Sequence, residues 1–316
     1  MNNCKAFTAK RNNMQPLPQK EKYEYQGSSL VVNAPAKLNL FLLIAGKRPD
    51  GFHKIDTLMT KVSWYDSLCL EEGSSPGIEL TCKGEYWAPE DESNLVLKAG
   101  KLIFRELGLS EPNLRITLRK NIPAGTGLGS ASSDCAAAID GIDNYFSLNM
   151  SHEFRHYIAG QLGSDVPFFL GGPISRCTGK GEKLQKVDLS LSGVMFEIFL
   201  PDFTCSTAKV YSFCKHSQKD YEEKLEAVNN ALKQGSAEKI CKLGVNMLEK
   251  PCFEAYPEAE EFAKKQNNGE KLALSGSGCA FYRFFSINKL ENHKKNAKID
   301  NYSALGGSRL VSSNSW

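Results

Sequence analysis

The chain has 316 residues and a net charge of +3, with 41% hydrophobic and 24% charged residues. This length suits two ordinary domains, and the composition is that of a globular protein. The small charge argues against a nucleic-acid-binding protein, and no apolar run approaches the ~20 residues of a membrane-spanning helix. Ten cysteines without a CxxC pair indicate a reducing compartment, so we expect a cytoplasmic protein of bacterial type.

The first 27 residues are predicted to form a disordered extension. Residues 1–20 contain four basic side chains and no acidic one. They lack the apolar core of a secretory signal peptide, and their basic character leaves import into an organelle as a minor alternative. We expect the remainder to divide into an N-terminal domain, residues 28–173, and a C-terminal domain, residues 174–316.

The first half mixes strands and helices. A polar stretch at residues 71–91 is predicted to be an insert, and Ser151 and Gly163 are a suitable helix cap and stop. Runs rich in apolar and β-branched residues predict strands at 30–35, 38–45, 53–62 and 114–118. Apolar residues recurring every three or four positions predict helices at 94–107, 132–146 and 151–162.

The second half continues the mixture, and its tail from residue 289 has no clear pattern. Strands are predicted at 174–177, 194–200, 271–274 and 279–285. Helices are predicted at 207–214, 221–232, 237–248 and 257–266. Because strands and helices do not alternate strictly, we predict an α+β architecture with a mixed or antiparallel sheet.

A glycine-rich loop opens the helix predicted at 132–146. Gly125, Gly127 and Gly129 allow positive φ and close approach of a ligand, and free N–H groups at a helix N-terminus attract anions. The loop therefore predicts a phosphate site, although a simple turn before a core helix would look similar. It is neither a Walker A box, since no Lys follows Gly129, nor a dinucleotide GxGxxG fingerprint.

Two charged residues are candidates for chemistry. Asp165 lies between a helix stop and an apolar run, where it could be a general base or only a helix-terminal acid. Lys37 interrupts an apolar stretch, so it is either functional or an ordinary edge-strand lysine. The turn at residues 275–278 could be a plain hairpin turn or a backbone platform beside the phosphate loop.

The segment 152–156 reads HExxH, the pattern of a zinc protease. If Ser151 is the N-cap, His152 and Glu153 lie in an exposed first turn, whereas a zinc protease needs both histidines in mid-helix facing a cleft. We therefore reject a zinc site here and explain Glu153 by the helix dipole.

Several segments in order along residues 30 to 285 resemble the GHMP kinase superfamily and, within it, the kinases of 4-diphosphocytidyl-2-C-methyl-D-erythritol. The glycine loop indicates only the superfamily, and the other segments are more specific. The matching segments are Pro35-Ala36-Lys37-Leu38-Asn39-Leu40, Arg48-Pro49-Asp50-Gly51-Phe52-His53, Ser93-Asn94-Leu95, Lys120-Asn121-Ile122-Pro123, Leu162-Gly163-Ser164-Asp165-Val166-Pro167-Phe168-Phe169 and Leu274-Ser275-Gly276-Ser277-Gly278. The resemblance implies a two-domain α+β fold, with an N-terminal domain like domain 2 of ribosomal protein S5 and a ferredoxin-like C-terminal domain.

Residue roles are implied by the same resemblance. Asp165 would take the proton of the substrate hydroxyl, and Lys37 would stabilise the developing charge. Phe52 and Tyr211 would sandwich a cytosine ring whose polar edge His53 reads. Mg²⁺ would bridge the ATP phosphates, with no side chain bound directly to the metal. The implied ATP-binding residues are Asn94, Leu95, Lys120, Pro123, Gly125, Gly127, Leu128, Gly129, Ser130, Ser132 and Ser133. The implied substrate-binding residues are Asn39, Phe52, His53, Thr207 and Tyr211.

The chain departs from the family pattern in its glycine loop. Ser130 and Ala131 stand where these kinases usually carry glycines, and Asp134 replaces an amide, so its charge should weaken ATP binding unless a cation offsets it. Phe52 replaces the commoner Tyr and keeps the stacking ring.

The resemblance implies an ATP-dependent kinase that phosphorylates the 2-hydroxyl of its cytidylyl substrate in non-mevalonate isoprenoid synthesis. We expect a monomer or homodimer with a small-molecule substrate and with neither nucleic acid nor membrane as partner. One alternative is another GHMP kinase with a mevalonate-type substrate, which gives no reason for the Asp50-Gly51-Phe52-His53 segment. A non-catalytic binding protein of the same fold is the other, and the retention of Lys37 and Asp165 argues against it.

Overall fold

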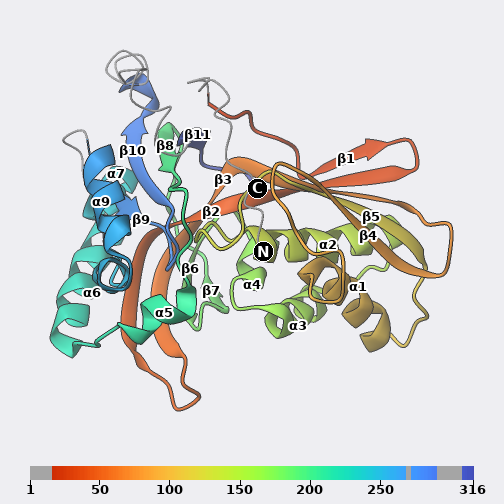
Figure 1. The fold of residues 1–316 in the computed structure, drawn as a ribbon, viewed down its shortest axis with the longest axis horizontal. Coiled ribbons are helices and arrows are strands. Elements are labelled where there is room, and N and C mark those ends of the chain that lie inside the picture. Colours follow the sequence, from red (N-terminus) through yellow and green to blue (C-terminus); the bar gives the residue numbers. More distant parts are fainter. Residues whose placement is uncertain (1–15, 268–271, 290–307) are drawn as a thin grey trace.

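The computed structural model describes residues 16–267, 272–289 and 308–316, and these residues form two β-sheets with flanking helices (Figure 1). The larger sheet has the strand order β1-β2-β3-β5-β4, with β6 paired to β3 and β7 to β6. Its strands are β1 (Tyr23–Gln26), β2 (Ser29–Lys47), β3 (His53–Glu72), β4 (Gly77–Gly84), β5 (Asn113–Lys120), β6 (Ile174–Gly179) and β7 (Lys183–Gln185). The smaller sheet, in the order β11-β8-β10-β9, consists of β8 (Val194–Phe199), β9 (Ala273–Leu274), β10 (Phe281–Ser286) and β11 (Ser308–Ser312).

The helices fall into two groups on either side of the long strands β2 and β3 (Figure 1). The first group packs against the larger sheet and comprises α1 (Leu95–Glu106), α2 (Ser130–Phe146), α3 (His152–Leu162) and α4 (Val166–Leu170). The second group lies nearer the smaller sheet and comprises α5 (Thr207–Ser212), α6 (Gln218–Lys233), α7 (Ala237–Leu243), α8 (Glu249–Ala255) and α9 (Pro257–Gln266), followed along the chain by a 3₁₀ turn at Ile287–Lys289. No helix in the described parts of the chain is long and apolar enough to cross a membrane.

The hairpin of β2 and β3 connects the two halves of the molecule. Its residues enter one apolar core with α1, α2 and β5, and a second core with β8, β10 and α6. Two separate strands were predicted where β2 runs unbroken for 19 residues. Irregular register falls between Pro35 and Ala36 and between Asn39 and Phe41. Such bulges redirect side chains, and these two flank Lys37 and Asn39.

Helix limits that depend on local caps are confirmed. Asn94 caps α1 by accepting from Val96 N, and Ser151 caps α3, which ends at Gly163. The helix predicted at 237–248 is wrong in its second half, because Gly244 adopts a left-handed φ of 48° and ends α7. A separate helix, α8, follows.

Elements whose partners are distant in the sequence differ from the predictions. The expected insert at 71–91 contains β4, which pairs in parallel with β5. The structured chain begins before residue 28, since β1 pairs with β2 and Leu17 N donates to Leu310 O at 2.9 Å. Residues 1–15 of the expected extension and Lys271 of a predicted strand lie outside the described residues. β6 pairs with β3 in the larger sheet, although residue 174 was the expected start of the second domain. The division into two domains stays a prediction.

Candidate active site

The glycine loop rests on the turn at residues 275–278, so the platform is the correct alternative for that turn. A Cβ built on Gly127 would lie 2.2 Å from Ser275 O, and one on Gly278 would lie 2.2 Å from Thr126 C. Ala280 N donates to Thr126 O at 2.9 Å, and Ser275 Oγ donates to Gly127 O at 3.0 Å. Backbone contact this close requires glycine on both sides.

The loop leaves the N-terminus of α2 without a side-chain cap. Gly125, Gly127 and Gly129 all have left-handed φ, at 74°, 86° and 74°. Gly129 is the N-cap residue of α2, and no side chain accepts from the first-turn amides there. An uncapped helix N-terminus after a left-handed turn presents N–H groups to an anion. The geometry therefore suits the phosphate site that the sequence predicted.

Lys37 lies under the loop and is almost fully buried, with 3% of its surface exposed. Its backbone N donates to Leu128 O at 2.9 Å, and its Nζ donates to Asn39 Oδ1. Asn39 Nδ2 in turn donates to Thr57 Oγ1 at 2.8 Å, which keeps its oxygen toward the lysine. A Cβ on Gly276 would lie 3.3 Å from Lys37 Nζ. The ammonium group is therefore held between the glycine loop and the platform.

The electrostatic surroundings of Lys37 favour its neutral form more than water does. Burial lowers the pKa of Lys37, and the charge of Asp165 opposes that shift. Asp165 is half-buried at the N-cap of α4, and within the described structure its carboxylate has no hydrogen-bond partner. It also acts on Tyr211, whose pKa is raised first by burial and then by this carboxylate. An unpaired carboxylate near a buried ammonium group has the properties of a general base.

Lys120 and Ser130 form a buried cluster on the other side of the loop. Lys120 Nζ donates to Asp134 Oδ2 at 2.6 Å and also contacts the Asp66 carboxylate and the Ser130 hydroxyl. Asp66 Oδ1 accepts from Asn121 N at 2.5 Å and from Ile122 N at 2.8 Å. Lys120 thus offsets part of the charge of the two carboxylates, and the family-atypical Ser130 is part of the same network. Sequence reasoning missed Asp66, although this acid interrupts an apolar stretch of β3.

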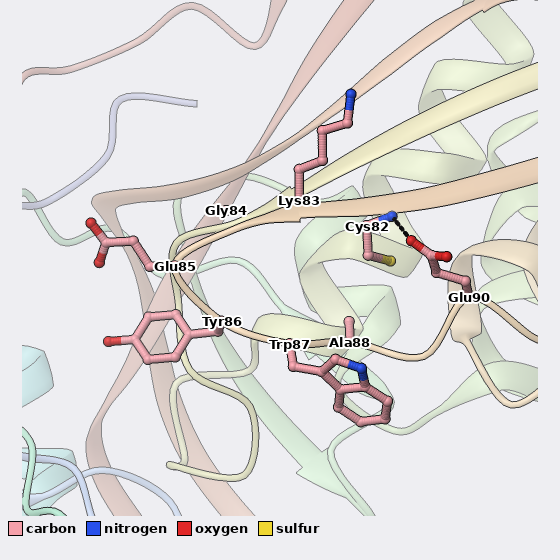
Figure 2. A pocket seen from close by; sticks show the side chains of 8 residues that line it. All are labelled: Cys82, Lys83, Gly84, Glu85, Tyr86, Trp87, Ala88 and Glu90. Atoms are coloured by element: carbon pink, nitrogen blue, oxygen red, sulfur yellow. Dashed lines mark hydrogen bonds between the residues drawn. The ribbon is translucent and has the colours of Figure 1, made fainter. Parts of the chain in front are cut away.

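A cavity of about 490 Å³ adjoins the start of α1 (Figure 2). The exposed ring of Trp87 stands at its rim. Asn94 reaches the cavity wall, since its Nδ2 donates to Pro89 O at 2.7 Å, and Lys120 O accepts from Glu85 N at 2.7 Å. The lining residues are Cys82, Lys83, Gly84, Glu85, Tyr86, Trp87, Ala88 and Glu90. The resemblance implies ATP-binding roles for Asn94, Leu95 and Lys120 but does not indicate this loop, because residues 71–91 are predicted to be an insert.

Of the expected substrate residues, His53 and Tyr211 are in contact near the tip of the β2–β3 hairpin, whereas Asn39 lies beside Lys37 in the middle of β2. The rings of His53 and Tyr211 are 4.9 Å apart, and burial lowers the pKa of His53. Thr207 Oγ1 accepts from Ser277 Oγ at 3.0 Å, which joins α5 to the platform. The Phe52 ring is 59% exposed and lies under Lys180 Nζ at 5.0 Å.

The HExxH segment begins helix α3 as predicted. Ser151 Oγ accepts from Phe154 N at 3.1 Å, so His152 and Glu153 occupy the first turn, and both are exposed. The rejection of a zinc protease site rests on this exposed position in the first turn of α3.

Comparison with known proteins gives a consistent result. A family model, the GHMP kinases N terminal domain, matches residues 94–172. A 4-diphosphocytidyl-2-C-methyl-D-erythritol kinase of Chloroherpeton thalassium is 33% identical over 262 residues, 82% of this chain and 90% of the relative. The enzyme of that name from Methylacidiphilum infernorum is 37% identical over 256 residues, 80% and 85% of the two chains.

Solved structures agree with these relatives. The crystal structure of a 4-(cytidine 5'-diphospho)-2C-methyl-D-erythritol kinase superposes with a TM-score of 0.72 at 28% identity, covering 90% of this chain and 100% of that one. A homoserine kinase from Cytophaga hutchinsonii superposes with a TM-score of 0.70 at 18% identity, covering 94% and 98%, and shows the shared fold alone.

Proposed function

The chain belongs to the family of 4-diphosphocytidyl-2-C-methyl-D-erythritol kinases, and we propose that it phosphorylates the 2-hydroxyl of that compound with ATP. The reaction is a step of non-mevalonate isoprenoid synthesis. One observation carries the assignment of the site: buried Lys37 lies between the glycine loop and the platform, within the field of an unpaired Asp165. Phosphoryl transfer asks a protein mainly for positioning and charge stabilisation, and this arrangement offers both.

The transfer itself is assigned to Asp165 and Lys37. Asp165 accepts the proton of the 2-hydroxyl as its oxygen attacks the γ-phosphorus of ATP. Lys37 stabilises negative charge on the transferring group, and its buried position strengthens that interaction. Asn39 orients the lysine through its side-chain oxygen and lines the site for the substrate alcohol.

ATP is assigned to the loop and the neighbouring cavity. The phosphates would bind the N–H groups of residues 125–130 at the uncapped N-terminus of α2. The adenine would enter the cavity beside Trp87, whose exposed ring can stack on a purine. Asn94 and Lys120 then support its walls through their hydrogen bonds with the 82–90 segment.

Mg²⁺ is expected to bind together with ATP, and the oxygen atoms at the start of α2 suit this ion. Ser133 Oγ and Asp134 Oδ1 are buried oxygens without a hydrogen-bond partner in the described structure, and Mg²⁺ prefers oxygen ligands. The bound ion would neutralise charge on the β- and γ-phosphates. Residues 130–134 of α2 would be the part of the chain nearest to it.

The cytidylyl end of the substrate is assigned to the tip of the β2–β3 hairpin. Tyr211 and the exposed Phe52 supply flat apolar faces for a cytosine, and His53 supplies a ring nitrogen for its polar edge. The lowered pKa of His53 keeps this ring neutral near pH 7, with one nitrogen donor and one acceptor. Thr207, in the same helix as Tyr211, contacts the platform through Ser277.

The test is ADP formation with ATP, Mg²⁺ and the cytidylyl substrate, in the unaltered protein and in Asp165→Asn. We expect turnover in the first and a loss of roughly 10²- to 10⁴-fold in kcat in the second. A stable unaltered protein that forms no ADP would refute the kinase assignment. Full turnover in Asp165→Asn would keep the kinase and remove its proposed base.

A further inference from the structure

Lys61 of β3 is a buried lysine that the proposed reaction does not use. It is 1% exposed, and its Nζ donates to Phe169 O at 3.0 Å and to Gly171 O at 2.8 Å. Its backbone N donates to Pro173 O at 2.8 Å. The lysine therefore binds the last turn of α4 and the chain that follows it. A cation at a helix C-terminus is stabilised by the carbonyl groups exposed there.

The helix that Lys61 holds touches both parts of the proposed active site. Asp165 is the N-cap residue of α4, one residue before its first turn. The Phe169 ring packs against the phosphate loop, since a Cβ on Gly129 would lie 2.8 Å from Phe169 Cζ and 2.9 Å from Lys37 Cγ. A shift of α4 would therefore move the base and the loop together.

The C-terminus of the chain seals Lys61 from water. Asn314 N donates to Lys61 O at 2.9 Å. The Trp316 ring lies 5.6 Å from Lys61 Nζ and stacks on Tyr65 at 6.1 Å, and its Nε1 donates to Lys20 O at 2.7 Å. An aromatic face opposite a cation attracts it most when water is excluded.

We propose that Lys61, covered by Asn314–Trp316, is a positioning residue that fixes α4 and so sets the placement of Asp165 and Gly129. The proposal rests on the proposed kinase function, because it concerns the geometry of that site. Its consequence is that a segment at the very end of the chain, remote in sequence from every implied site residue, influences the rate of phosphoryl transfer.

The charge on Lys61 is costly to the folded protein. Its pKa is lowered to about 7, chiefly by burial and also by nearby Lys22, while Asp140 of α2 opposes the shift. A lysine with a lowered pKa in the folded state makes folding less favourable below the unfolded value of 10.5, and this loss diminishes as the pH rises. A positioning role gives a reason for this cost, since functional sites exchange stability for activity.

The main test replaces Lys61 by methionine, with the exposed Lys186→Met as the matched control. In Lys61→Met we expect an unchanged or higher melting temperature, KM values for ATP and substrate within about twofold, and kcat lower by roughly 10- to 100-fold. Lys61→Arg, which keeps a cation for the same carbonyls, should recover part of kcat. Unchanged kcat in Lys61→Met would overturn the proposal, as would equal losses of stability and kcat that Lys61→Arg does not restore.

Two further measurements keep the proposal testable whatever the first gives. Because the pKa of Lys61 is about 7, kcat of the unaltered protein should change in a step centred near pH 7. Trp316→Ala admits water to Lys61, so this step should move to higher pH. A step that does not move contradicts the role of Asn314–Trp316. Hydrogen exchange at the backbone amides of Val166 and residues 168–171 should accelerate in Lys61→Met and in Trp316→Ala, and unchanged exchange contradicts the positioning role of Lys61. Hydrogen exchange does not depend on turnover. An inactive unaltered protein would therefore refute the kinase assignment, while the exchange rates would still test whether Lys61 fixes α4.

Discussion

Two buried lysines flank the glycine loop, and their surroundings differ in the number of carboxylates they meet. Lys120 is enclosed by Asp66 and Asp134, whose charges raise its pKa despite burial. Lys37 meets an amide oxygen at close range and a single acidic residue, Asp165, acting through its charge, so burial dominates and its pKa falls. Lys120 therefore holds the loop in place, whereas the charge of Lys37 remains available to a ligand.

The difference follows from the elements on each side. Lys120 ends β5, and β3 and α2 both direct an acidic side chain toward it. Lys37 lies between two bulges in β2, facing a platform of glycine backbone. A fully paired lysine is already neutralised, whereas an incompletely neutralised one gains most when phosphate arrives.

The largest effect is expected from Lys37→Met, which removes the available charge. We expect kcat to fall by about 10³-fold, because a charge-stabilising donor in a dry site is worth roughly this much. The melting temperature should be unchanged or higher, since a buried ammonium group with a lowered pKa is removed. Steady-state kinetics and thermal unfolding measure the two effects. If Lys37→Met were less stable but its folded fraction kept full specific activity, the roles assigned to the two lysines would be reversed.

Lys120→Met should show the opposite pattern. It leaves Asp66 and Asp134 buried without their cation, and breaking a buried pair in this way costs about 3–5 kcal/mol of unfolding free energy. Urea unfolding measures this loss, with the exposed Lys98→Met as the control. At temperatures below its thermal unfolding transition, Lys120→Met should keep measurable turnover. A loss of turnover without a loss of stability would place Lys120 in the chemistry instead.

The pH dependence of the unaltered enzyme should separate the two lysines further. Since the pKa of Lys37 is lowered, kcat should decline on the alkaline side before an ordinary lysine would titrate. Since the pKa of Lys120 is raised, the stability it contributes is complete below 10.5 and is lost only as the pH rises through its folded value. Kinetic and unfolding profiles from pH 6 to 11 measure both. Coincident losses of activity and stability would contradict the distinction.

What the sequence predicted depended on how local each feature is. The glycine loop, the helix beginning near residue 94 and the start of α3 at Ser151 follow from a few adjacent residues, and the structure contains them. The α+β GHMP kinase fold is confirmed by the family match and the solved structure, and the sequence indicated it because the matching segments occur in order along the chain. The residue roles remain proposals.

The features that were missed depend on contacts between distant residues. Asp66 approaches Lys120 only through the pairing of β3 with β5, and Lys61 meets Gly171 from 110 positions away. The sequence predicts an insert in place of β4, because the partner of that strand, β5, lies beyond helix α1. Neither hydrophobic periodicity nor turn residues indicate such pairings, because tertiary packing determines them.

The smallest effect is expected from Asp134→Asn, which restores the amide usual in the family. Burial and the neighbouring Asp66 raise the pKa of Asp134, while Lys120 opposes the shift. A carboxyl with a raised pKa in the folded state favours folding at low pH, and that contribution falls as the pH rises above 3.8. The variant should therefore show a flatter stability profile from pH 4 upward.

Near pH 7 the stability of Asp134→Asn should stay within about 1 kcal/mol of the unaltered protein. The amide keeps an oxygen for Lys120, Asp66 remains as its counter-ion, and the new N–H group replaces Asp134 Oδ1, which has no hydrogen-bond partner in the described structure. Urea unfolding at pH 5 and pH 8 measures the change, with KM for ATP as the functional readout. A large loss at both pH values would mean that Lys120 needs two carboxylates, and that Asp134 is part of the anchor rather than a tolerated departure from the family.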